Sequence, residues 1–311
     1  MMRDPARKTI IALVFIFSTI DIGSSFVIIA LIIYHRKKHP IGSCQLLSCN
    51  TYLAVLISCY SVLDAYIYLW NSSSNSFLSS SNDWCYARAY LIHSGLSSIY
   101  HSQVLQAFYR FIRIVLFKHK YLQSLRFTVI LIVLQWIFVC STILILLLFH
   151  HFEYIPYYHF CQISFKNLTG LIIAAVNGYE LPLILIASLY FYIIYFIKRT
   201  NSFTNYNRPR LYRRDLVVFN RVLTLIFVLV FFCFPAILLW IIYIITGNLH
   251  PLIYHVQWLF FSFSLAFLPA TSVMITTDLQ YLIRIRPQRM SQVRPITHVQ
   301  QNQNDYRLKR I

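Results

Sequence analysis

Acidic residues and glycine are both scarce in this chain. Asp and Glu together number 9 among 311 residues, against 27 Lys and Arg, and there are 6 glycines. So few glycines leave little for the broken, closely packed helices of a secondary transporter, and no inverted repeat is visible. The sequence also lacks a nucleophile elbow, a phosphate-binding loop and a repeat of metal ligands. We therefore expect neither an enzyme nor a protein that holds a metal or another cofactor.

What the sequence contains instead is long apolar runs. Seven segments, at residues 10–34, 46–70, 87–115, 127–149, 171–197, 222–245 and 252–276, are each about the 20 residues that a helix needs to cross a hydrocarbon core of about 30 Å. In lipid every backbone N–H and C=O group must find its partner within the segment, so the segments are predicted to be helices and not strands. The expected fold class is all-α, a seven-transmembrane helix bundle.

The net charge of +18 is distributed unevenly along the chain. Of the 27 Lys and Arg, 22 lie in or beside the loops 35–39, 110–126 and 198–221 and in the tail 284–310. The other five, on the opposite side, are Arg3, Arg7, Lys8, Arg88 and Lys166. The positive-inside rule then predicts a cytoplasmic tail and an N-terminus outside, although three cations before the first segment oppose this. The basic loops are expected to touch anionic membrane lipid as well. A nucleic-acid partner is not expected, because no recognition motif accompanies the positive charge.

These segments leave little of the chain outside the membrane. We expect a short extracellular N-terminus at residues 1–9, a transmembrane domain at 10–286 and a disordered cytoplasmic tail at 287–311, which is rich in Gln, Asn and Arg. Residues 277–285 have near-helical apolar spacing, which predicts a short amphipathic helix on the inner membrane surface or the frayed end of helix seven. A cleavable signal peptide is the alternative for the first segment, but its apolar run resumes and is long enough to span.

Two cysteines and one arginine have an informative spacing. Cys85 opens the third segment, and Arg110 lies 25 residues later at its inner end, within Tyr109-Arg110-Phe111. The chain here resembles the rhodopsin-like family of G protein-coupled receptors, in which a Cys at the outer end of helix three precedes the Arg of an Asp/Glu-Arg-Tyr motif by that interval. The resemblance implies a disulfide between Cys85 and Cys161, which lies between helices four and five. The alternative is two unrelated thiols.

Further residues match family motifs in the expected order along the chain, and the resemblance covers about residues 10–286. They are Trp136 in helix four, Pro182 and Tyr190 in helix five, Pro235 in helix six, Pro269 in helix seven, and the runs Gly23-Ser24-Ser25-Phe26-Val27 and Leu53-Ala54 in helices one and two. The resemblance implies a G protein-coupling switch at Arg110, with Tyr109, Tyr190, Pro235 and Pro269 as its other parts. Arg110 would be freed when helix six moves and a heterotrimeric G protein inserts. The prolines permit kinks that serve such a movement. The alternative is an arginine that reaches the interface only as a topology anchor.

The chain departs from the family at several polar positions. Tyr109 replaces the acid next to the arginine, Ile57 stands at the acidic position of helix two, and Leu268 precedes Pro269 where the family has Asn. The usual ion pair beside Arg110 cannot form, so we expect a looser inactive state, and no sodium site of the usual kind. The same departures keep open a non-signalling protein that only binds, such as a decoy.

The ligand is less well specified. Ser262 stands where opsins have their retinal lysine, and Ile92 stands where amine receptors have an Asp, so the resemblance implies neither ligand. Intramembrane polar and aromatic residues are the candidates for a pocket: Asp64, Tyr66, His93, Tyr179, Glu180, Trp240 and Tyr243. The two carboxylates would meet a cationic or peptide group. The alternative is that these side chains bond to neighbouring helices or face the headgroups. His150 and Glu153 are read as part of an interfacial loop and not as a metal site.

Two N-glycosylation sequons, at Asn71 and Asn167, lie on the face predicted to be outside. We therefore expect a seven-helix receptor of the plasma membrane that transmits an extracellular ligand, a peptide or a small molecule, to a cytoplasmic G protein. The alternatives are the decoy and, less favoured, a small membrane transporter.

Overall fold

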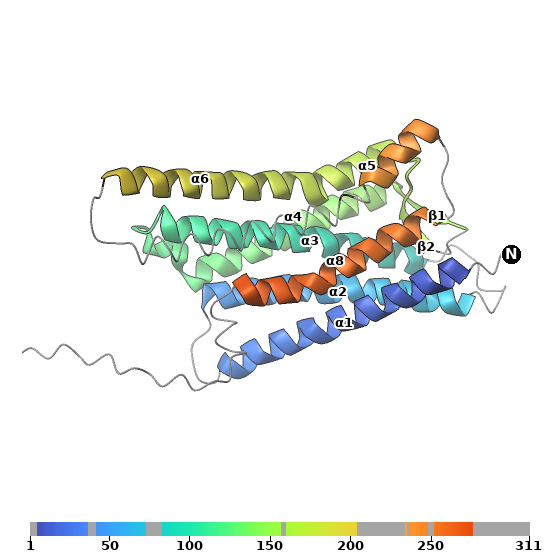
Figure 1. The fold of residues 1–311 in the computed structure, drawn as a ribbon, viewed down its shortest axis with the longest axis horizontal. Coiled ribbons are helices and arrows are strands. Elements are labelled where there is room, and N and C mark those ends of the chain that lie inside the picture. Colours follow the sequence, from blue (N-terminus) through green and yellow to red (C-terminus); the bar gives the residue numbers. More distant parts are fainter. Residues whose placement is uncertain are drawn as a thin grey trace, which may run out of the picture.

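The computed structural model describes residues 5–36, 42–72, 83–156, 160–203, 234, 237–247 and 252–275. The helices are α1 (Pro5–Arg36), α2 (Ser43–Ser72), α3 (Asp83–Ile114), η2 (Lys120–Gln123), α4 (Leu125–Leu148), α5 (Leu168–Ala175), η3 (Val176–Glu180), α6 (Leu181–Phe203) and α8 (Ile253–Ile275). One further helical stretch covers Ile237–Thr246. The long helices lie roughly side by side in one bundle (Figure 1). The tail 287–311, the expected amphipathic helix at 277–285 and Pro235 lie outside the described residues.

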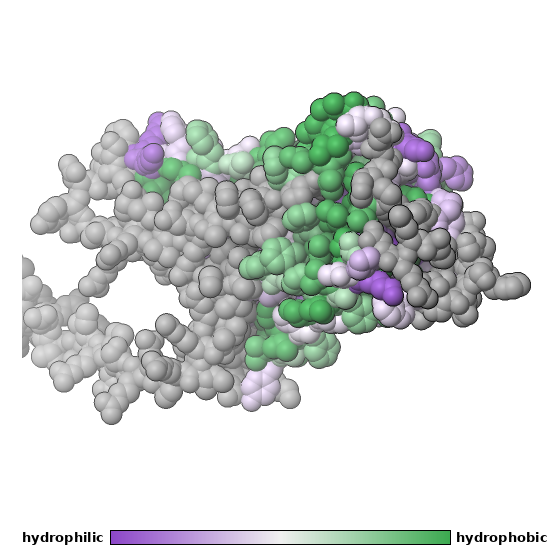
Figure 2. Space-filling view, turned by 45° about the vertical axis from the view of Figure 1, so that its right-hand side comes forward, coloured by the Kyte–Doolittle hydropathy of each residue, from purple (hydrophilic) through white to green (hydrophobic). Residues whose placement is uncertain are grey.

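Four helices are long and apolar enough to cross a membrane, and the chain is therefore a helical membrane protein. They cover Pro5–Tyr34, Ser43–Trp70, Leu125–Leu148 and Leu168–Arg199. Many large apolar side chains point outward from them, such as Phe26 and Phe191, which are 67% and 75% exposed. Figure 2 shows a band of hydrophobic side chains with hydrophilic ones toward either end. This surface suits a lipid environment, since apolar side chains on a water-facing surface gather only in small patches.

Helix α3 has the central place in the bundle and α4 a peripheral one. Fourteen of the 32 residues of α3 are buried, and many of those are polar, including Arg88, Ser98 and Gln103. In α4 five of 24 residues are buried, and most of the remaining side chains are apolar. A helix enclosed by protein can carry polar groups because its neighbours supply their hydrogen-bond partners, whereas a helix in contact with lipid cannot.

A hydrogen-bonded clamp joins α2, α3 and α4. Asn50 Nδ2 donates to Gln135 Oε1 at 2.7 Å, and Trp136 Nε1 donates to Asn50 Oδ1 at 2.8 Å. Gln135 Nε2 in turn donates to the carbonyl oxygen of Ser98 in α3 at 3.3 Å. Such bonds are worth roughly 0.6–2 kcal/mol each inside a membrane protein. Trp136, a mark of the family resemblance, therefore belongs to a three-helix polar contact.

Helices α2 and α3 approach each other closely at Gly95. A Cβ atom built on this glycine would lie 2.8 Å from the Cβ of Ser58 and 2.9 Å from its backbone nitrogen. Small residues at such points let helix backbones come close, which strengthens van der Waals packing where no hydrophobic effect drives association. Position 95 therefore requires glycine for space.

Local sequence explains where several helices begin and end. Ser124 Oγ accepts a hydrogen bond from the Phe127 N–H and caps the start of α4. At its other end His151 N–H donates to the Leu146 carbonyl and His150 N–H to the Leu147 carbonyl. This is the Schellman arrangement, which places the intervening residue in the left-handed region, and His150 has φ of 56°. Pro5 begins α1, where its missing N–H is not needed.

The fifth predicted segment is a single rod with an interruption. Helix α5 passes into the wider π-helical turn η3, and α6 follows directly. Pro182 explains the wide turn, because its ring would clash with the carbonyl of Gly178 four residues earlier in a regular α-helix. The sequence analysis predicted the rod but not the interruption.

A short antiparallel hairpin joins α4 to α5, and it was not predicted. Strand β1 (Phe152–Ile155) pairs with β2 (Phe160–Ile163), and Tyr154 stands opposite Cys161. Cys161 forms a disulfide with Cys85 at the start of α3, with 5.5 Å between the two Cα atoms, which confirms the predicted pairing. All four residues of β2 are buried. We call the end of the bundle that carries β1, β2 and the start of α3 the hairpin end (Figure 1).

The opposite end carries η2 and the end of α6 (Figure 1). Its described charged residues are basic and include Arg110, Arg113, Lys118, Lys120, Arg126, Lys198 and Arg199. The described residues of the hairpin end contain the acids Asp64, Asp83 and Glu153 beside their cations. The two ends of the bundle therefore differ in charge as well as in structure.

Candidate functional site

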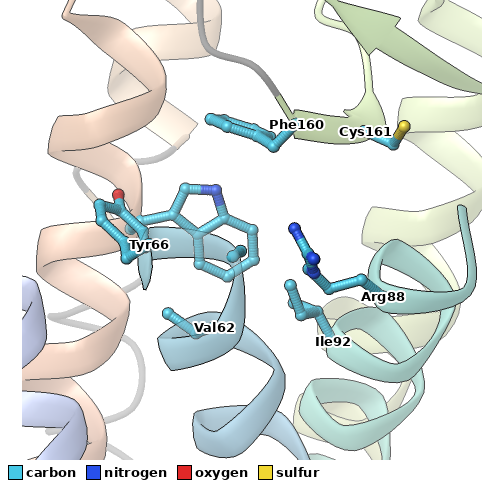
Figure 3. Close-up of a pocket in the computed structure, with 8 residues that line it drawn as sticks. Val62, Tyr66, Arg88, Ile92, Phe160 and Cys161 are labelled. Carbon is cyan, nitrogen blue, oxygen red and sulfur yellow. The ribbon is translucent and has the colours of Figure 1, made fainter. Parts of the chain in front are cut away.

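A cavity lies at the hairpin end, between α2, α3, α8 and the hairpin. Its walls are made by Val62, Ala65, Tyr66, Arg88, Ile92, Phe160, Cys161 and Trp258. In Figure 3 Phe160 and Cys161 lie above the space, Val62 and Ile92 lie below it, and Tyr66 and Arg88 face it from opposite sides. The unfilled space is about 320 Å³, a figure that includes its open mouth. The enclosed part is narrow, and seven of its eight lining side chains are apolar or aromatic.

Arg88 is the one charged side chain in the lining of this cavity. It is 5% exposed, and its Nε lies 2.7 Å from Oδ2 of Asp64 on α2. The two groups form an ion pair, but the Nε–H does not point at the oxygen, so the contact is not a well-aligned hydrogen bond. The guanidinium carbon also lies 5.0 Å from the centre of the Tyr68 ring. An aromatic face at this distance attracts a cation and further fixes the side chain.

Asp64 holds Arg88 from the rim of the cavity. Its carboxylate also accepts a hydrogen bond from Trp84 Nε1 at 3.2 Å. The Asp64 side chain is 33% exposed, against 6% for Arg88, so the carboxylate lies nearer the solvent and the guanidinium lies deeper. A buried charge needs such a partner, because leaving either member alone costs several kcal/mol.

The hairpin forms the roof of the cavity and is attached to two helices. Its disulfide fixes Cys161 to α3, and Trp258 Nε1 of α8 donates to Gln162 Oε1 at 3.0 Å. Tyr254, one turn earlier on α8, accepts a hydrogen bond from the Phe165 N–H at 3.0 Å. Phe160 is thereby held over the space between α3 and α8.

A layer of rings lies beside the cavity. Tyr66 Oη is 3.5 Å from Nδ1 of His255, a fully buried residue of α8. The His93 ring stands edge-on to Phe152 and Trp258, with ring centres 5.3 and 6.4 Å apart. These ring contacts restrict the side-chain conformations of Tyr66 and Trp258, which form walls of the cavity.

The predicted pocket residues are distributed over several places. Tyr66 lines the cavity, Asp64 stands at its rim, and His93 packs behind Trp258. Tyr179 lies elsewhere, with its ring 4.9 Å from Tyr100 and 5.9 Å from Phe261.

Three further candidates do not line the cavity. Glu180 is exposed on the outer side of η3. The Tyr243 ring lies 6.4 Å from Phe165, and Trp240 is partly buried against the apolar core. The position of a residue in the sequence indicates its depth along a helix, whereas the helix face that it occupies decides which residues it meets.

Six of the eight lining residues were not among the sequence candidates, namely Val62, Ala65, Arg88, Ile92, Phe160 and Trp258. Arg88 was counted only as a charge for topology, and Ile92 only as a departure from the amine receptors. Phe160 and Trp258 were not singled out at all. Arg88 could have been recognised from the sequence, because a cation inside a membrane-spanning segment indicates a functional site.

The opposite end contains the second predicted group of residues. Arg110 Nη1 donates to Tyr190 Oη at 3.0 Å, a bond that joins the end of α3 to α6. Next to it, Phe111 packs against Tyr192 with ring centres 5.5 Å apart. Tyr109 is partly buried, and Pro269 is a buried proline inside α8. Arg110 and Tyr190, chosen from sequence as parts of one switch, are thus in direct contact.

One intramembrane acid lies away from both ends. Asp21 of α1 is fully buried, and its Oδ2 accepts from the Cys59 thiol at 3.7 Å. Its Oδ1 has no hydrogen-bond partner within the described residues. A thiol is a weak donor, so this carboxyl group is poorly satisfied for an ionised acid.

The glycosylation candidates lie at helix ends near the hairpin end. Asn71 is in the last turn of α2. Asn167 caps α5 through Oδ1, which accepts from the Gly170 N–H at 3.1 Å. Comparison with family models and with curated proteins finds no match for this chain.

Proposed function

We propose that this chain is a seven-transmembrane receptor that passes an extracellular ligand signal to a heterotrimeric G protein. The observation that carries the proposal is the pairing of Arg110 with Tyr190, because it joins α3 to α6 at the basic end of the bundle. The resemblance assigns those two residues to one switch, and the geometry brings them within hydrogen-bond distance. The disulfide between the start of α3 and the hairpin supports the same reading.

The orientation follows from charge. The described charged residues of the end opposite the hairpin are all basic, which favours the cytoplasm for that end. The hairpin end, with its disulfide, then faces the oxidising outside. In this orientation the cavity opens to the extracellular side of the plasma membrane, and Arg110 faces the G protein.

The switch would work through the contact between α3 and α6. A hydrogen bond from a charged donor contributes about 1.5–3 kcal/mol, which corresponds to roughly a 10- to 100-fold change in an equilibrium between two states. Tyr109 offers no carboxylate to hold Arg110 in place, so Tyr190 is the partner whose position determines where the guanidinium points. Separation of α3 from α6 would release Arg110 toward the cytoplasm.

The test compares basal nucleotide exchange on G proteins in membranes containing the wild-type chain or the Arg110→Ala variant at equal surface level. We expect measurable basal exchange that falls to background in the variant. Arg113→Ala is the matched control, since Arg113 lies one turn further on and is exposed, and it should leave exchange unchanged. Exchange that persists in Arg110→Ala, or falls equally in both variants, would contradict the role given to Arg110.

A second candidate function is binding without signalling. Ile57 and Tyr109 stand where the family has acids, and a decoy tolerates the loss of both. Ligand-stimulated exchange separates the two candidates, because a decoy binds its ligand with no exchange at any concentration. Substrate flux into liposomes tests the remaining alternative, a small transporter.

A further inference from the structure

The guanidinium of Arg88 has donors that the protein does not use. Asp64 contacts it through Nε, and Tyr68 lies near its carbon. Among the described residues, its two terminal amino groups make no hydrogen bond, and the fully buried donor without a well-aligned partner is Nε. An arginine carries five N–H donors, and a buried donor without a partner is costly. In Figure 3 the guanidinium extends into the cavity from the α3 side.

The walls around those amino groups are apolar. Tyr66, Phe160 and Trp258 form the aromatic side of the space, and Val62 and Ile92 form its base. The cavity is therefore lined by one guanidinium group and otherwise by aromatic and aliphatic side chains. Low surrounding polarity strengthens the attraction between the guanidinium and an opposite charge.

We propose that this cavity binds a small organic carboxylate, whose two oxygens meet the terminal amino groups of Arg88 and whose apolar part lies against Phe160 and Trp258. The planar guanidinium matches a carboxylate with two parallel N–H···O bonds, which a lysine cannot offer. The proposal rests on the receptor function for its purpose, because it names the chemical class of the extracellular ligand.

The charge arrangement favours an acid over an amine. Asp64 is the nearest carboxylate, and it is already engaged by Arg88 and by Trp84. A cationic ligand would have to displace Arg88 from Asp64 and leave the guanidinium buried without a partner. An anionic ligand leaves the ion pair in place, because Asp64 contacts Nε and the ligand uses the terminal amino groups.

The size of the space limits the ligand. The unfilled space of about 320 Å³ includes open solvent at the mouth, so the enclosed part is much smaller than this figure. It can hold at most the carboxyl group of a ligand. The apolar part of the ligand would therefore lie toward the mouth, beside Phe160.

The experiment measures thermal unfolding of the purified full-length protein with acetate, butyrate or phenylacetate, each compared with its neutral amide. We expect at least one carboxylate to raise the unfolding temperature in a saturable manner, while its amide does not. Phenethylamine, the cationic analogue of phenylacetate, should have no such effect. The readout needs no G protein, so failure of this proposal and failure of the receptor proposal are distinguishable.

The variants are chosen so that no charge is left buried alone. The double variant Arg88→Gln/Asp64→Asn removes both charges, and we expect it to weaken carboxylate binding by about 10- to 100-fold. Lys166→Gln, which removes an exposed cation near the same end, should bind as the wild type does. The assignment is overturned if no carboxylate stabilises the protein, if the amides stabilise it equally, or if the double variant retains the wild-type affinity.

Discussion

Gly95 is a point of close contact between α2 and α3, and Gly95→Ala tests this contact. The added methyl would lie 2.8 Å from Ser58 Cβ, 2.9 Å from Ser58 N and 3.0 Å from Ser58 Cα. Two of these atoms belong to the α2 backbone, so a side-chain rotation cannot relieve the contact. Helices α2 and α3 must separate by several tenths of an ångström, which overpacking data place at about 1–3 kcal/mol.

Alanine also favours the helix, by about 1 kcal/mol over glycine, which offsets part of this cost. The expected net destabilisation is up to about 2 kcal/mol relative to the wild type, and about 1–3 kcal/mol relative to a glycine-to-alanine change without the clash, which is a fall of roughly 2–6 °C in unfolding temperature. The measurement is thermal unfolding of purified protein, followed by the loss of the monodisperse peak in size-exclusion chromatography.

Gly23→Ala is the matched control, because a Cβ at Gly23 meets nothing within 4 Å. Its unfolding temperature should equal or exceed that of the wild type. Adding Ser58→Gly to Gly95→Ala should restore stability only in part, since the α2 backbone contacts remain. Equal unfolding temperatures for Gly95→Ala and Gly23→Ala would refute the close approach of α2 and α3 at this level.

Two other predictions concern the segment between α4 and α5. Cys161→Ser opens a disulfide whose two cysteines are 76 residues apart, so it should lower the free energy of unfolding by about 2–4 kcal/mol. Cys85→Ser should have the same effect, and the double variant should lose no more. Cys140→Ser, at a free cysteine, should leave the unfolding temperature unchanged. His150→Gly should stabilise the protein by about 0.5–1 kcal/mol, because glycine occupies the left-handed region without strain. A lower unfolding temperature for His150→Gly would show that its imidazole makes a contact worth more than the strain.

The helices of the bundle were predictable from the sequence because the membrane imposes a simple rule. Backbone groups in lipid must pair within their own segment, so apolar length alone gives α1, α2 and α4 nearly to their ends. Helix α3, predicted as one of the seven apolar runs, is less apolar and is not among the four helices that qualify as membrane spans within the described residues. Its polar content has a physical cause, since residues such as Ser98 and Gln103 face protein and not lipid.

The hairpin and the cavity could not be obtained by the same rule. The strands have four residues each, too short for an alternating pattern to stand out, and β2 is buried on both faces. Lining residues come from four elements that are distant in sequence, and depth along a helix does not tell which face a residue occupies. Arg88 was therefore counted only among the cations that predict the orientation in the membrane, although it is buried beside the cavity.

Strand β2 is tied at neighbouring residues to two different helices, by Cys161 to α3 and by Gln162 to α8. If α3 and α8 move apart, the disulfide keeps Cys161 with α3, so the hydrogen bond between Gln162 and Trp258 of α8 must break or the strand must shift. A fluorescent label on β1 at Glu153, an exposed position, would then report movements of α8 from outside the bundle. The position of the hairpin above the cavity therefore depends on the spacing between α3 and α8.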